Sequence, residues 1–224
     1  MVNNSSKNNL SKKKNQSLLR SSPIINRNYL PEQTIKKIRY SFRYNKDFPS
    51  ISLINFLDKN SYFFLRKELS CLNLIKQKNP LLHSYSKSLL PKHVTSFFNR
   101  KDLHDFITKI IGIDVDKIDL SYYRFSRKDY MMLHDPTSNR KKNQRGYDLL
   151  FDLTLNWNEE WGGTIFCIDC FGNHHKILQH QNTLTIIERK RENNSYPKCY
   201  LKYINNYAKN NKRLLIMGKI ITSK

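Results

Sequence analysis

The residue best suited to chemistry in this chain is His134, which follows the strand-like segment Tyr130–Leu133 and precedes Asp135. An imidazole and a carboxylate at the end of a strand are typical ligands of a three-ligand Fe(II) site that keeps coordination positions open. A short pair of this kind is more often part of an ordinary surface loop. Its meaning therefore depends on the elements that position it.

Other candidate ligands are weaker. Cys167 and Cys170 have the spacing of a metal or redox pair, but no second cysteine pair follows and a zinc site needs four ligands. We predict packing cysteines. Three histidines cluster near Gly172-Asn173, where a hairpin tip is expected: His174, His175 and His180. No glycine-rich phosphate loop and no serine nucleophile elbow occurs in the sequence.

The composition predicts a soluble, intracellular (cytoplasmic) protein with one substantial core. Of 224 residues, 38% are hydrophobic and 12% aromatic, which is ordinary for a folded chain. No apolar run approaches the roughly 20 residues of a transmembrane helix, and the first residues are polar. Four cysteines are sparse for this length, so a disulfide framework is not expected.

The chain is strongly basic, with 40 Lys and Arg against 18 Asp and Glu, a formal net charge of +22. Such a field attracts nucleic acid, anionic membranes and acidic proteins, so a weak polyanion contact is one hypothesis. The basic residues are also spread along the whole chain, as an AT-rich genome would produce. Aromatic and basic residues alternate at 40–44 and 122–125, which fits single-stranded nucleic acid binding but favours half-buried strands.

Two regions are expected along the chain. Residues 1–47 read as a basic, flexible N-terminal tail, with one or two helical turns at 32–40. Residues 48–224 form the domain. Helical spacing of apolar residues occurs at 62–72 and 94–111, the second interrupted near Asn99-Arg100 and stopped by Gly112.

Short strand-like segments dominate after Gly112 and are separated by turn formers. Eight such strands predict a sandwich, barrel or double-stranded jelly roll, and helices followed by strands indicate an α+β domain with helices packed on one sheet. The expected strands are 120–125, 130–133, 147–155, 163–168, 175–178, 183–188, 198–204 and 213–221.

The stretch from Tyr122 to Gly163 resembles the prolyl-4-hydroxylase-like group of Fe(II)/2-oxoglutarate-dependent dioxygenases, and the likeness extends over residues 48–224. The family's order is an aromatic Gly-Asp-Tyr-like segment, His-x-Asp, a hydrophobic strand, Trp, an acidic pair, Trp-Gly-Gly, an Asn-x-Leu strand and a late basic residue. The matching residues here are Lys128-Asp129-Tyr130, His134, Leu149–Leu155, Trp157, Glu159-Glu160, Trp161-Gly162-Gly163, Asn182-Thr183-Leu184 and Arg213.

The resemblance implies a double-stranded β-helix (jelly-roll, cupin-like) fold with an N-terminal helical support layer. It implies Fe(II) as cofactor, 2-oxoglutarate as co-substrate, ascorbate as an optional addition, and hydroxylation of a protein side chain such as proline. In this scheme His134 and Asp135 bind the metal and Arg213 anchors the far carboxylate of 2-oxoglutarate. Trp157 and Trp161 support the core.

The sequence departs from the family at two ligand positions. The second ligand falls on Pro136, so Asp135 reaches a metal only through a turn or bulge. No histidine follows His180, and residues 195–199 and 205–207 stand where the distal histidine is expected. Three hypotheses therefore remain: a hydroxylase, an enzyme with a reduced ligand set, and a pseudo-enzyme that binds an acidic protein or nucleic acid through its charge.

Overall fold

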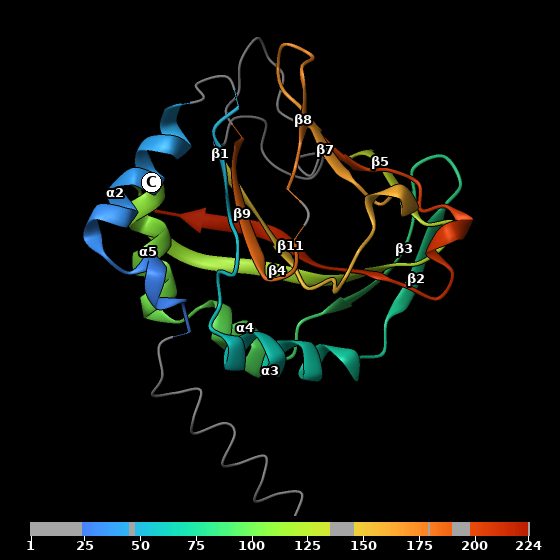
Figure 1. Ribbon diagram of the computed structural model, residues 1–224, viewed down its shortest axis with the longest axis horizontal. Helices are drawn as coiled ribbons and strands as arrows, with labels where there is room; N and C mark the ends of the chain where they lie inside the picture. Colours follow the sequence, from blue (N-terminus) through green and yellow to red (C-terminus); the bar gives the residue numbers. More distant parts are fainter. Residues whose placement is uncertain (1–23, 45–47, 135–145, 179, 190–197, 224) are drawn as a thin grey trace, which may run out of the picture.

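The computed structural model describes residues 24–44, 48–134, 146–178, 180–189 and 198–223, except for the side chains of residues 133 and 134. Figure 1 shows a curled sheet with helices against one side. In chain order the elements are η1 (Arg27–Tyr29), α2 (Glu32–Tyr44), β1 (Ser50–Leu53), α3 (Lys59–Ser70), β2 (Ile75–Asn79), β3 (His83–Leu89), α4 (Lys92–Phe98), α5 (Lys101–Ile111), β4 (Val115–Phe125), β5 (Tyr130–His134), β6 (Gly146–Asp152), η2 (Glu159–Trp161), β7 (Ile165–Ile168), β8 (His174–Lys176), β9 (Thr183–Arg189), β10 (Lys198–Leu201), η3 (Asn206–Ala208) and β11 (Arg213–Thr222).

The described strands form one antiparallel sheet that folds over on itself. Its order is β1-β9-β6-β11-β4-β3-β5-β10-β7-β8, with β2 paired to β3 alone. The β1 to β4 part makes one wall and the β5 to β8 part makes the other. Strand β3 joins them because it pairs with both β4 and β5. This is the double-stranded β-helix, and all eight strands predicted after Gly112 are present.

The helices cover the outer face of the wall that contains β9, β6, β11 and β4 (Figure 1). Helix α5 buries five apolar residues at i, i+3, i+4 spacing, which gives it a continuous apolar stripe toward the sheet. Gly112 ends this helix in the left-handed conformation at φ 78°, as predicted. Helix α3 begins at Asp58, whose carboxylate accepts hydrogen bonds from the amides of Asn60 and Ser61.

A second core fills the space between the two walls. Alternate residues of each strand point inward, so Phe125, Ile165, Ile187, Leu201 and Leu215 meet there. The barrel has two ends. At the His134 end, β5 finishes and β6 begins. At the Arg213 end, β4 finishes and β11 begins, with Arg213 opposite Phe125.

The N-terminal boundary differs from the prediction. Residues 1–23 lie outside the described residues, but Ile24, Ile25, Ile38 and Phe42 belong to the buried core under the helices. The backbone of Ile25 also pairs with Leu57. The segment 24–44 is therefore part of the folded body, because helix α2 buries its apolar stripe against α5 and β1.

Two further points concern individual elements. The hairpin β2–β3 was missed, because Pro80 interrupts its segment between the two strands and apolar residues such as Ile75 and Leu81 are exposed. The interruption predicted near Asn99 is confirmed: α4 ends there and α5 begins at Lys101.

Within the described residues, no helix has both the length and the apolar character needed to cross a membrane.

Candidate functional site

The interior of the barrel contains a pocket of about 270 Å³. Both walls and the connecting strand β3 contribute to its lining: Lys87, Tyr123, Met131, Asp148, Leu149, Leu150, Ile165, Cys199, Met217, Gly218 and Lys219. The floor is mainly apolar, while the charged side chains come from β3, β6 and β11. An apolar cavity with a few convergent polar groups is the usual form of a small-molecule site.

His134 lies at the last position of β5, where its backbone faces Cys199 of β10. The side chain of His134, Asp135 and Pro136 lie outside the described residues, so their predicted metal-binding role stays a prediction. The facing position does not supply a free ligand. Cys199 is joined to Cys167 of β7 in a disulfide, contrary to the expected packing cysteines. These two residues lie opposite each other in the β7–β10 register.

Arg213 lies at the other end of the barrel, where its Nη1 pairs with Asp152 and its buried Nε has no hydrogen-bond partner among the described residues. Its side chain is 2% exposed, and Nη1 lies 2.9 Å from Oδ1 and 2.7 Å from Oδ2 of Asp152. The guanidinium carbon lies 5.8 Å from the ring centroid of Trp157. Burial raises the pKa of Asp152, while Arg213 and the amide of Thr154 act in the opposite direction. The predicted 2-oxoglutarate anchor thus already holds a carboxylate.

A second buried arginine occupies the His134 end and was not predicted. Arg189 is on the inward face of β9, with 1% of its side chain exposed and Nε 3.0 Å from Oδ2 of the pocket residue Asp148. Its Nη1 and Nη2 are buried and have no hydrogen-bond partner among the described residues. Buried polar groups almost always have partners, so two free guanidinium nitrogens indicate a place for an anion.

Lysines surround the same part of the pocket. Lys219 of β11 lies directly across the ladder from Asp148. Lys87 of β3 places Nζ 5.1 Å from the ring centroid of Tyr123, and burial raises the pKa of that phenol to about 12. Tyr123 is therefore a neutral hydrogen-bonding group at physiological pH. Arg189, Lys87 and Lys219 thus make this end of the pocket rich in basic side chains.

The tryptophans support the Arg213 end of the barrel. Trp157 donates a hydrogen bond from Nε1 to the carbonyl of Gly162 at 2.9 Å, and its ring meets that of Trp161 edge to face at 5.3 Å. Gly162 has φ 79°, and a Cβ there would lie 2.1 Å from the carbonyl oxygen of Tyr203. The Trp-Gly-Gly corner consequently packs tightly against the segment that follows β10.

His174 and His175 lie on strand β8, in the hairpin predicted near Gly172, whereas His180 follows that strand. The carboxylate of Asp169 accepts hydrogen bonds from the amides of Phe171 and Asn173, and it lies 2.8 Å from Nε2 of His175. Burial opposes ionisation of Asp169, but these hydrogen bonds outweigh it and lower its pKa to about 2. The ring of His175 stacks on Phe48 with a centroid distance of 4.3 Å.

The described residues do not supply the iron site that the resemblance implies. No group of three or more His, Cys, Asp or Glu side chains within the described part of the chain could hold a metal ion. In the sequence, proline stands at the second ligand position and no histidine follows His180. Cys199, the residue opposite His134, has its sulfur in a disulfide. One imidazole alone does not make a three-ligand centre.

Comparison with known proteins identifies the fold. No protein-family model and no curated protein sequence matches the chain. Among solved structures, a prolyl-4-hydroxylase from Pseudomonas putida is 12% identical, with a TM-score of 0.61, and covers 84% of this chain and 100% of its own. A 2-oxoglutarate/Fe(II) oxygenase-family protein from Burkholderia pseudomallei is 9% identical, with a TM-score of 0.64 and coverages of 86% and 92%.

A prolyl hydroxylase from Trichoplax adhaerens, solved with a peptide of the hypoxia inducible factor oxygen degradation domain, is also similar. It is 12% identical, with a TM-score of 0.57, and covers 95% of this chain and 93% of its own. At sequence identities this low, the structural similarity shows the fold but not the substrate or the activity. The expected α+β jelly roll with a helical layer is confirmed: the chain has the double-stranded β-helix fold of the 2-oxoglutarate/Fe(II) oxygenases, in the form found in prolyl-4-hydroxylases.

Proposed function

We propose that this chain binds a small dicarboxylate of the 2-oxoglutarate type in the barrel pocket, without the iron centre of its structural relatives. The observation that carries the proposal is the buried guanidinium of Arg189, with two unpaired nitrogens beside a pocket that already holds Lys87 and Lys219. A buried donor without a hydrogen-bond partner costs about 1–3 kcal/mol, and a bound carboxylate removes that cost.

The charges define the expected ligand. Arg189 and the pocket lysines Lys87 and Lys219 supply basic groups that suit a ligand with two carboxylates. The apolar floor formed by Leu150, Ile165 and Met217 suits a short carbon chain between two carboxylates. Arg213 is not available for this role while Asp152 holds it. The carboxylates would therefore be bound toward the His134 end.

The test is calorimetric titration of the full chain with 2-oxoglutarate in the presence of EDTA. We expect measurable binding, and weaker binding of 2-oxobutanoate, which lacks the second carboxylate. Lys219→Met should weaken binding at least about tenfold, since one charge-assisted contact is worth about 1.5–3 kcal/mol. The matched control is Lys117→Met, an exposed lysine on the neighbouring strand β4. Absence of heat with the folded protein, or equal loss in both variants, contradicts the proposal.

A second candidate function rests on the position of His134 at the end of β5. In this candidate, the chain is an Fe(II)/2-oxoglutarate-dependent hydroxylase that acts on a protein side chain such as proline. It would bind iron through His134 and Asp135 and anchor 2-oxoglutarate through Arg213. Anaerobic Fe(II) titration and a succinate-release assay distinguish it from the iron-free binding protein. Succinate formation that is lost in His134→Ala would establish the hydroxylase. Ligand binding in EDTA without succinate formation would support the binding protein.

A further inference from the structure

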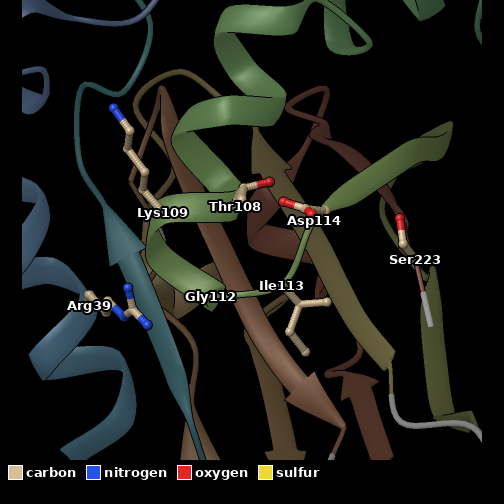
Figure 2. A pocket seen from close by; sticks show the side chains of 7 residues that line it. All are labelled: Arg39, Thr108, Lys109, Gly112, Ile113, Asp114 and Ser223. Carbon is tan, nitrogen blue, oxygen red and sulfur yellow. The ribbon is translucent and has the colours of Figure 1, made fainter.

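A second pocket, of about 480 Å³, lies on the outside of the domain and shares no lining residue with the barrel pocket. Figure 2 shows it between helix α2, the C-terminal end of α5 and the last residues of the chain. Arg39 and Lys109 lie on one side of the view, and Asp114 and Ser223 lie on the other. The lining includes the charged residues Arg39, Lys109 and Asp114, which favours a charged group over a purely apolar ligand.

Two guanidinium groups converge at the edge of this pocket. A Cβ atom built on Gly112 would lie 2.5 Å from Nη2 of Arg43 and 2.9 Å from Nη2 of Arg39. Arg43 donates one hydrogen bond, to the carbonyl of Ile111 at 3.2 Å. Within the described residues, neither arginine nor Lys109 forms a salt bridge. Three cations thus gather with Asp114 as the one carboxylate in the lining.

Two tyrosines of helix α2 are exposed next to these cations. Tyr40 and Tyr44 are 69% and 74% exposed, one helical turn apart, with ring centroids 5.8 Å from each other. They are not needed for the core, because the apolar stripe of α2 is formed by Ile35, Ile38 and Phe42. Each ring directly follows Arg39 or Arg43 in the sequence, so the row of tyrosines and the row of arginines are offset by about 100° around α2.

We propose that this surface, formed by Arg39, Tyr40, Arg43, Tyr44 and Lys109, binds single-stranded nucleic acid. Phosphate groups pair with the guanidinium and ammonium groups at the pocket, and unstacked bases lie on the two tyrosine rings. The net charge of +22 adds long-range attraction for a polyanion. This binding is independent of the dicarboxylate in the barrel, since the two sites share no residue.

The same surface is less suited to the other anionic partners. A helix that lies in a membrane interface needs a free apolar face, whereas the apolar face of α2 is buried in the core. An acidic protein would pair with the cations but would leave the two exposed tyrosine rings without a stacking partner. Each nucleotide provides a base for stacking on a ring and a phosphate for pairing with a cation, so a single strand uses the tyrosines and the basic groups together.

The experiment is fluorescence anisotropy of a labelled twenty-nucleotide oligothymidylate titrated with the full chain over a range of salt concentrations. Tyr44→Ala should weaken binding at least about fivefold through the loss of one stacked base. The matched control is Tyr207→Ala, a tyrosine 77% exposed in η3. Arg39→Gln should lower the slope of log affinity against log salt by about 0.7, the value for one phosphate contact on a single strand.

Each outcome decides the proposal. Tighter binding by wild type than by Tyr44→Ala, with Tyr207→Ala unchanged, supports it. Equal binding by all variants would assign the contact to other basic residues, such as those of 1–23, and would overturn it. Binding to vesicles that contain phosphatidylserine, without binding to the oligonucleotide, would also overturn it and would indicate a membrane contact. Circular dichroism of each variant shows whether it is folded before any comparison.

Discussion

Replacing Asp152 by asparagine leaves the guanidinium of Arg213 buried without a counter-charge. Both oxygens of Asp152 lie within 3 Å of Nη1, and the two side chains are 7% and 2% exposed. Removal of one partner from a buried pair costs about 3–5 kcal/mol, because an arginine cannot lose its proton to escape the desolvation. A domain is typically stable by about 5–15 kcal/mol, so this single change removes a large part of the stability.

The reverse change, Arg213→Met, should cost less. The remaining carboxyl group can bind a proton, and burial already raises its pKa. We expect a loss of about 1–3 kcal/mol from the unpaired acceptor. The double variant Asp152→Asn/Arg213→Met should be more stable than the sum of the single losses predicts, by about 1–3 kcal/mol. The free energies are measured by urea unfolding, followed by tryptophan fluorescence because Trp157 stacks on the guanidinium.

The control is Asp105→Asn, an exposed carboxylate on α5. If the double variant loses the sum of the two single losses to within about 0.5 kcal/mol, the two side chains are not coupled and the buried-pair reasoning is refuted. The same variants also test the anchor role of Arg213. If Arg213 receives the dicarboxylate, 2-oxoglutarate should restabilise Asp152→Asn more than it stabilises wild type. We expect no such excess, since our proposal puts the ligand at the other end of the barrel.

Three further predictions concern the supports of the barrel. Asp169 has a pKa near 2, below the ordinary 3.8, so its ionised form adds about 2 kcal/mol to the free energy of unfolding. This contribution is complete above pH 4 and is lost as the pH falls toward 2. Acid unfolding of wild type and of Asp169→Asn measures it. Gly162→Ala should lower the melting temperature far more than Gly172→Ala, because both sites have positive φ but a Cβ clashes with backbone at Gly162 alone. Cys199→Ser should cost about 3–4 kcal/mol, given a separation of 32 residues between the disulfide partners, as measured by urea unfolding without reductant.

Much of the fold could be predicted because strand and helix periods are local properties. The alternation along β6, β9 and β11 and the stop at Gly112 are visible in single segments. The hairpin β2–β3 was missed, since its exposed apolar residues do not alternate with the sheet and its role depends on pairing with both β4 and β5. Helix α2 was assigned to a tail because its burial is set by α5, which lies far along the chain.

The site was less predictable because it depends on register between distant strands. Asp148, Leu150 and Asp152 share one face of β6, and two carboxylates on a buried face require cations. That signal was present in the sequence. It could not reveal that Arg189 reaches Asp148 or that Arg213 reaches Asp152, because those contacts follow from the pairing of β6 with β9 and β11. The partner of Cys199 likewise follows from the β7–β10 register.

The distribution of charge inside the barrel gives a ligand one preferred orientation. Each end of the barrel holds one buried arginine paired with one aspartate of β6, Arg213 with Asp152 and Arg189 with Asp148. Among the described residues, Nη1 and Nη2 of Arg189 lack hydrogen-bond partners, whereas Nη1 of Arg213 contacts both oxygens of Asp152. For the dicarboxylate proposed above, binding at the His134 end would reverse the orientation that the resemblance implies for the far carboxylate. In that proposal Asp152 is the cause, since it pairs with the guanidinium that the resemblance assigns to the ligand.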